Sequence, residues 1–280
     1  MRARATSISL PVTRRQLFGF TYRTHLTFLM KLSLLLTLFA LPLYAVEIVT
    51  QVFQSGVLSD FSATGDISYY RLYLSRNLFF ALLRVPAGMI LSVGLTGAFA
   101  LMKAYTFADG YTFWGSFRQG IREDARRSLP VSLFFAVVSY LAEFSRCFLS
   151  MRDISWYVPA AVVATVLQLL LLGAYLFCMC QIPIYRASCP RLIKNGFLFT
   201  GKCLFGIIGV ALVSLAPVLA AGLFGSLTGI LVTAGLFAFL LFGNGILLIT
   251  LYCQHCFDEL INRDRYPEIY RKGLFDGEHE

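Results

Sequence analysis

Long apolar runs alternate with short polar segments along the whole chain. Each run is about 20 residues or longer, which is the length that an α-helix needs to cross the hydrocarbon core of a bilayer. No run alternates between apolar and polar residues with a period of two, so the pattern does not indicate a β-barrel. The pattern predicts an all-α integral membrane protein with six transmembrane helices, over residues 29–49, 78–102, 129–149, 157–182, 203–224 and 227–252.

The last two predicted helices share a long stretch of chain without a charged residue. From Cys203 to Phe257 there are 55 residues without Asp, Glu, Lys or Arg. This stretch is too long for one crossing of the bilayer and suits two. Gly222, Gly225 and Ser226 near its middle predict the turn between the two helices.

The basic residues lie mostly on one side of the predicted helices. Nineteen of the 24 lie on one side: in the tails (1–28 and 258–280), between the second and third spans, between the fourth and fifth spans, or at Lys31. The remaining five lie on the other side. Because basic residues are retained in the cytoplasm, the sequence predicts cytoplasmic N- and C-termini and a long external loop over residues 50–77. The alternative is a cleaved signal peptide ending near Leu43-Tyr44-Ala45. It is disfavoured because roughly 30 residues precede the apolar run.

The composition leaves no room for a separate soluble domain. Of the 280 residues, 58% are hydrophobic and 14% are charged, whereas about 25% are charged in a soluble domain. We therefore expect one membrane domain, residues 1–280, whose main partner is the lipid bilayer. The net charge of +9 lies beside the spans, which indicates orientation in the membrane and contact with anionic lipid rather than binding of nucleic acid.

The segment before the third predicted helix mixes aromatic and basic residues. Within residues 107–127, Trp114, Phe117 and Ile121 fall on one helical face, and arginines spaced by four form a basic stripe. A helix of this kind lies flat at the membrane surface. We expect contacts with lipid headgroups from Trp114 and from the stripe, which consists of Arg118, Arg122 and Arg126.

Charged residues within the predicted spans form the candidate ligand site. Arg84 and Glu143 fall at similar depth in two antiparallel helices, Arg146 lies one turn from Glu143, and Glu47 ends the first span on the same side. Charges within spans usually face the interior of the bundle or a cavity. The functional hypothesis is an outward-open pocket in which Arg84, Glu143 and Arg146 bind a polar solute or a proton. The alternative is a structural Arg84–Glu143 pair that reaches toward the interface.

The sequence indicates no catalytic motif and no cofactor. It contains no phosphate-binding glycine loop, no His-Glu-x-x-His and no Gly-x-Ser-x-Gly, so we expect a protein without enzymatic activity, cofactor or metal. The seven cysteines lie mostly in apolar runs, which favours reduced, packed thiols. Cys253 and Cys256 share a helical face, and a thiolate metal or redox site there is the alternative to packing.

Two segments carry a resemblance to a known family. In the first, a small-residue span end runs through Lys103 into an Asp-Gly-Tyr turn, and in the second, Pro183 and Tyr185 precede a Leu-Ile-Lys-Asn-Gly-Phe run. The residues are Gly94, Gly97, Ala98, Lys103, Asp109, Gly110, Tyr111, Phe113, Phe117, Gly120, Tyr175, Pro183, Tyr185 and 192–197. Over most of residues 28–260 the chain resembles the YesL-type family of bacterial multi-pass membrane proteins, a domain of unknown function. The resemblance implies the bacterial cytoplasmic membrane and an association with carbohydrate uptake, and it supplies no catalytic residue.

These observations lead to three functional hypotheses. The first is a non-enzymatic membrane protein that assists or regulates the uptake of a solute, of carbohydrates by the resemblance, together with other membrane proteins of an uptake system. The second is an autonomous permease for a small solute, which predicts a cavity reaching the midplane at Arg84 and Glu143. The third is a lipid-binding structural scaffold, which predicts a packed bundle without such a cavity.

Overall fold

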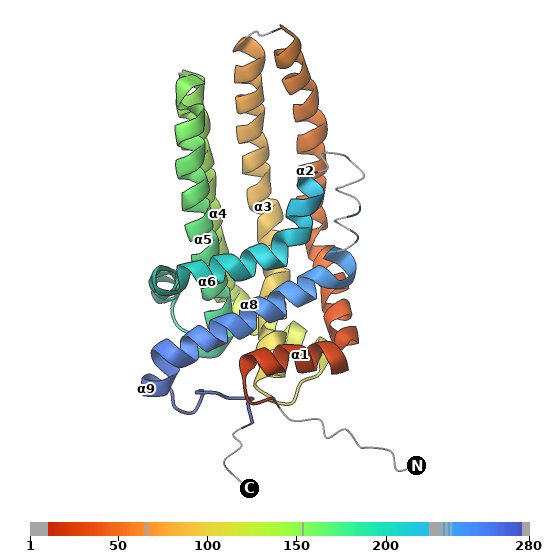
Figure 1. The fold of residues 1–280 in the computed structure, drawn as a ribbon, viewed down its shortest axis with the longest axis vertical. Coiled ribbons are helices and arrows are strands. Elements are labelled where there is room, and N and C mark those ends of the chain that lie inside the picture. The colour runs from red at the N-terminus through yellow and green to blue at the C-terminus, as the bar shows by residue number, and fades with distance from the viewer. Residues whose placement is uncertain are drawn as a thin grey trace.

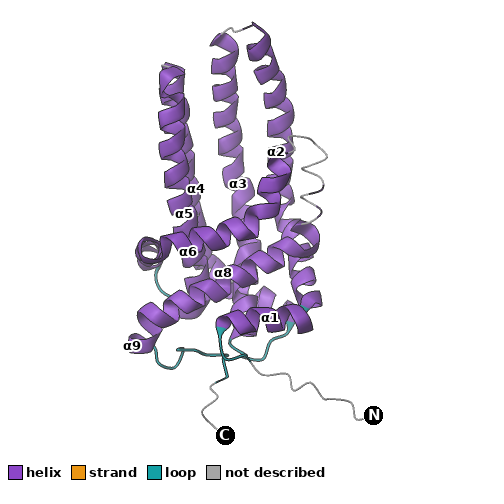
Figure 2. Cartoon of the chain, viewed as in Figure 1, coloured by secondary structure: helices purple, strands orange, loops and turns teal. Residues whose placement is uncertain are grey.

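The computed structural model describes residues 11–64, 67–152, 154–223, 232, 235 and 237–275. Within these ranges every regular element is a helix, and the loops are short (Figure 2). The elements are α1 (Arg14–Thr24), α2 (Leu26–Thr64), α3 (Ile67–Thr106), α4 (Phe113–Arg152), η1 (Ile154–Trp156), α5 (Tyr157–Tyr185), α6 (Cys189–Leu223), η2 (Phe237–Leu241), α8 (Phe242–Phe257), η3 (Asp258–Asn262) and α9 (Arg263–Arg265). The prediction of an all-α protein is confirmed for the described part of the chain.

Four long helices, α2 to α5, set the length of the molecule (Figure 1). They stand side by side, and α6 and α8 cross them in the half that lies nearer both chain ends. α2, α3 and α4 contain 39, 40 and 40 residues. At 1.5 Å per residue each is about 60 Å long, which is twice the thickness of the hydrocarbon core. Part of each helix therefore lies outside the core of a bilayer.

Five helices are long and apolar enough to cross a membrane, and they cover residues 26–57, 68–106, 113–151, 158–185 and 189–214. The fifth runs on from Cys189, and its backbone leaves helical geometry at Cys203 (φ −118°, ψ 24°), where the sequence predicts that the span begins. The predicted sixth span, 227–252, and the predicted turn at Gly225 and Ser226 lie partly or wholly outside the described residues. Its described end comprises η2 and most of α8.

The prediction that residues 50–77 form a loop is wrong for the described residues, which are helical. α2 continues to Thr64 and α3 begins at Ile67, so the segment is a helical hairpin. Polar side chains are compatible with a solvated helix, and the segment contains no proline to end one. The hairpin helices are also joined by the side chains of Gln54 and Asn77, whose amide groups are 3.1 Å apart.

The prediction of a separate surface helix over residues 107–127 is also wrong. α4 begins at Phe113 and runs unbroken past Pro130, where the sequence predicts that the span begins. The apolar face of its first turns packs against α3. Phe117 is buried, and a Cβ atom added at Gly120 would lie 2.3 Å from the Cβ of Ala100. Because α3 covers Phe117 and Gly120, this part of the face is not available to the membrane surface.

The buried core lies in the half of the molecule nearer the chain ends. Its largest fully buried side chains include Leu29, Leu32, Phe99, Met102, Phe177 and Phe257. Toward the other end, Tyr70, Leu74 and Cys147 form a much smaller cluster. There the α2–α3 pair and the α4–α5 pair separate in Figure 1. The candidate site lies between these two pairs.

A buried ion pair joins the two described ends of the chain. Arg14 on α1 donates to Asp258 on η3 at 3.1 Å, and it also donates to the carbonyl oxygen of Lys272 at 3.0 Å. The other oxygen of Asp258 accepts a hydrogen bond from Asn262 at 2.8 Å, and Asn262 accepts one from Tyr185 at 2.6 Å. These bonds connect α1, η3, α5 and the C-terminal segment in one network.

Asp109, in the loop between α3 and α4, holds the C-terminal segment from the other side. Its carboxylate lies 3.1 Å from Lys103 and 2.8 Å from Lys272. Burial opposes ionisation, but the hydrogen bonds and positive charge of Lys272 and Lys103 outweigh it and lower the pKa of Asp109. The carboxylate therefore remains charged and keeps the segment docked at neutral pH.

Candidate functional site

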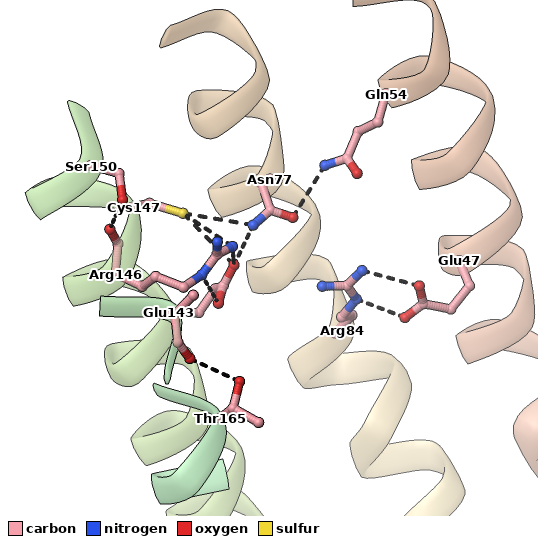
Figure 3. Close-up of polar contacts among 10 residues, drawn as sticks. Glu47, Gln54, Asn77, Arg84, Glu143, Arg146, Cys147, Ser150 and Thr165 are labelled. Carbon is pink, nitrogen blue, oxygen red and sulfur yellow. Dashed lines mark hydrogen bonds and ion pairs between the residues drawn. The ribbon is translucent and has the colours of Figure 1, made fainter. Parts of the chain in front are cut away.

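Arg84 on α3 forms a two-point ion pair with Glu47 on α2 (Figure 3). Nε and one terminal nitrogen donate to the two carboxylate oxygens at 2.7 and 3.0 Å. This fork geometry fixes the orientation of the guanidinium group. Both side chains are about one-third or more exposed, so the pair orients Arg84 more than it stabilises the fold.

Glu143 on α4 is the centre of a second, more buried polar cluster (Figure 3). Arg146, one turn along the same helix, donates to it from Nε at 2.9 Å and from a terminal nitrogen. The amide nitrogen of Asn77 on α3 donates to Glu143 as well. Because Asn77 also accepts from Gln54 on α2, the cluster connects three helices.

The alternative hypothesis, a direct Arg84–Glu143 pair, is wrong. Each residue has a different partner, Glu47 for Arg84 and Arg146 with Asn77 for Glu143. Similar depth in two helices does not determine which face of each helix carries the side chain. Arg84 and Glu143 nevertheless line the same cavity of about 320 Å³, together with Gln168 of α5. Arg146 does not belong to this lining and acts through Glu143.

A second cavity of about 390 Å³ adjoins the cavity at Arg84 and Glu143. The two share Ala136, Ser139 and Gln168 in their walls. We call the combined space the α3–α5 groove. Its wall on α3 extends from Ala81 to Leu95, a distance of about 21 Å at the helical rise. It is therefore long enough to reach from the charged clusters deep into the bundle.

The α3–α5 groove changes character along its length. One end presents the charged side chains of Arg84 and Glu143. The other end is lined mainly by leucine side chains and Phe135, and its hydroxyl groups, those of Ser132 and Tyr175, are 3.3 Å apart. Gln168 lines both parts, and its amide makes no hydrogen bond to the described residues. The groove thus suits an elongated molecule with a polar head and a less polar body.

A stripe of polar side chains on α4 continues beyond the groove toward the chain ends. It includes Ser132 in the groove wall, and Ser128 and Asp124 beyond the groove. Ser128 accepts a hydrogen bond from Thr96 on α3 at 2.6 Å, so α3 and α4 are in contact at this level. Asp124 lines a separate cavity of about 250 Å³. The stripe therefore connects two cavities across a closed, hydrogen-bonded section.

The residues predicted to contact lipid headgroups are accessible at the start of α4. The side chain of Trp114 is 68% exposed. Arg118, Arg122 and Arg126 are exposed as well, and the first two line a shallow depression with Gln119 and Glu123. Their exposure is compatible with lipid contact, which stays a prediction.

The cysteines are packed thiols in the structure. All seven are free, and Cys253 and Cys256 are buried on α8. Among the described residues no group of three or more His, Cys, Asp or Glu side chains is arranged to hold a metal ion. The predicted packing of these thiols agrees with this burial.

Two amides at the site are not among the residues predicted from the sequence. Asn77 lies at the edge of the second predicted span and Gln168 lies within the fourth. An uncharged polar residue in an apolar run signals an interior position, because it needs a partner away from lipid. A search limited to charged residues misses this signal.

No family model, curated protein or solved structure matches this chain.

Proposed function

We propose that the protein is a non-enzymatic, multi-pass membrane protein of solute uptake that binds a small polar solute in the α3–α5 groove. The observation that supports this proposal is that the two cavities adjoin, with Arg84 and Glu143 at one end and Gln168 in the walls of both. Charged and amide groups offer both hydrogen-bond donors and acceptors, as a hydroxyl-rich solute requires. The assignment of the solute to carbohydrates, and of other uptake proteins as partners, rests on the resemblance to the YesL-type family.

The proposed orientation has six spans and both termini in the cytoplasm of a bacterial cell. It is supported by the excess of basic residues on one side of the spans. The described chain ends also lie at the same end of the molecule in Figure 1, as an even number of crossings requires. In this orientation the charged end of the α3–α5 groove faces the outside, where a solute enters.

The polar stripe on α4 favours a second candidate, the autonomous permease. A carrier needs a binding site that can open to either side, and the stripe leads from the groove through Ser132 and Ser128 to the cavity at Asp124. The first hypothesis, a protein that assists uptake, requires only the groove. The scaffold hypothesis predicts a bundle without a cavity at Arg84 and Glu143, and the groove argues against it.

Replacing Gln168 with leucine is expected to abolish solute binding without unfolding the protein. The substitution removes the free amide from the middle of the groove, and Gln168 is exposed, so the fold loses little packing. We expect at least one of a panel of mono- and disaccharides to raise the melting temperature of the purified protein, and Gln168→Leu to remove that shift. The control is Val163→Leu, an exposed position on α5 outside the groove walls. A panel without effect, or a shift that persists in Gln168→Leu, contradicts the proposal.

A further inference from the structure

A third cavity, of about 250 Å³, lies where α3 ends, α4 begins and α5 ends. We call it the Asp124 cavity. Its walls are mainly polar and include Lys103, Asp109, Glu123, Asp124 and Arg186. A water molecule occupies about 30 Å³ in the liquid, so the cavity has room for a molecule of several non-hydrogen atoms. It is separate from the α3–α5 groove and lies near the chain ends, where Lys272 contacts Asp109.

The cations in the wall are already paired with carboxylates. Lys103 lies 3.1 Å from Asp109, and Arg186 donates to Glu123 at 2.8 Å. A ligand with a negative charge would therefore have to compete with both of these carboxylates and would also face Asp124. The charge pattern disfavours an anion in this cavity.

Of the three carboxylates in the wall of this cavity, Asp124 is the one that accepts no hydrogen bond from the described residues. Its residue is 4% exposed, and neither carboxylate oxygen accepts a hydrogen bond from the residues that the structure describes. The nearest cation is Arg127, whose terminal nitrogen lies 3.6 Å from Oδ1, which is too far for a hydrogen bond. A buried carboxylate without donors is destabilising by several kcal/mol in general. This carboxylate lines a cavity with space for a donor.

We propose that the Asp124 cavity binds a small organic cation with N–H donors, of the primary ammonium class. The positive charge compensates Asp124, and an N–H group supplies the hydrogen bond that the carboxylate lacks. The carboxylate of Glu123 lies in the same wall and adds attraction for a cation. Arg127 offsets part of the charge of Asp124 but donates no hydrogen bond to it. A neutral ligand would supply the hydrogen bond without the added attraction of a positive charge, so it binds less strongly.

The test compares three salts on the purified full chain in detergent at equal ionic strength. Ethylammonium chloride carries charge and N–H donors, tetramethylammonium chloride carries charge without donors, and potassium chloride controls for ionic strength. We expect ethylammonium well above its dissociation constant to raise the melting temperature by about 5 °C. The other two salts leave it unchanged, and Asp124→Asn removes the ethylammonium shift. Glu259→Gln, which removes an exposed carboxylate outside this cavity, retains it.

The melting temperature of Asp124→Asn without ligand shows whether Asp124 has a structural role or a ligand-binding role. Because Asp124→Asn removes a buried charge and keeps the shape, we expect it to melt at or above the wild-type temperature in potassium chloride. Melting well below wild type would identify Asp124 as a structural partner of Arg127 and overturn the proposal. An equal shift with tetramethylammonium, an ethylammonium shift that persists in Asp124→Asn, or no shift in the wild type would overturn it as well.

Discussion

Replacing Arg14 with methionine is expected to lower the melting temperature of the purified protein by on the order of 10 °C. Arg14 and Asp258 are 8% and 7% exposed, and their ion pair is 3.1 Å long. Removal of one member of a buried pair leaves an uncompensated charge, which typically costs 3–5 kcal/mol. For a chain of this size, 1 kcal/mol corresponds to roughly 2–4 °C. Thermal unfolding in detergent measures the effect.

Two further variants show whether the loss comes from the pair itself. Arg15→Met changes the exposed neighbour on α1 and should leave the melting temperature within about 2 °C of wild type. Arg14→Met combined with Asp258→Leu removes both charges, and it should melt above Arg14→Met alone, because no charge is left unpaired. A small effect of Arg14→Met, or additive losses in the double variant, would mean that the pair does not join the chain ends energetically.

Replacing Gly243 with valine is the second change with a large expected effect. A Cβ atom at Gly243 on α8 would lie 2.3 Å from the carbonyl oxygen of Leu29 on α2. The Gly243 amide also donates to the hydroxyl of Ser33 at 2.7 Å. Backbone atoms cannot rotate away as a side chain does, so the helices must separate, and overpacking of this kind costs about 1–3 kcal/mol or more. We expect a fall in melting temperature of about 5 °C or more.

The matched control for this change is Gly209→Val on α6. Among the residues that the structure describes, none outside its own helix has an atom within 4 Å of a Cβ added at Gly209, so the same substitution should be close to neutral there. If Gly243→Val and Gly209→Val melted together with wild type, α8 would not be packed closely on α2, and the arrangement of the helices near the chain ends would have to be revised.

The sequence predicted the membrane helices better than it predicted where they end. Apolar composition marks the part of a helix that lies in hydrocarbon, and it contains no signal for helix that continues into water. Residues 50–77 and 107–127 were therefore assigned to a loop and to a surface helix, whereas α2, α3 and α4 continue through them. At Cys203, in contrast, the predicted start of a span coincides with a change in the backbone geometry of α6.

The sequence places Arg84 and Glu143 near each other, but it does not predict which side chains they bind. Arg84 and Glu143 lie at one level because antiparallel spans place them there. Their partners depend on the rotation of each helix about its axis and on packing between helices, which the linear pattern does not contain. The burial of Asp124 could not be predicted for the same reason, because its polar cavity forms where α3, α4 and α5 approach one another.

The most direct test of the central claim is solvent access to the α3–α5 groove in intact cells. Ser139 lines both parts of the groove, and Ser128 lies beyond it on the same face of α4, where it is buried and hydrogen-bonded to Thr96. A cysteine at each position is exposed to a charged, membrane-impermeant thiol reagent from outside, with the native cysteines as the background. We predict rapid labelling of Ser139→Cys and slow labelling of Ser128→Cys. Protection of Ser139→Cys comparable with that of Ser128→Cys would contradict an outward-open solute site between α3, α4 and α5.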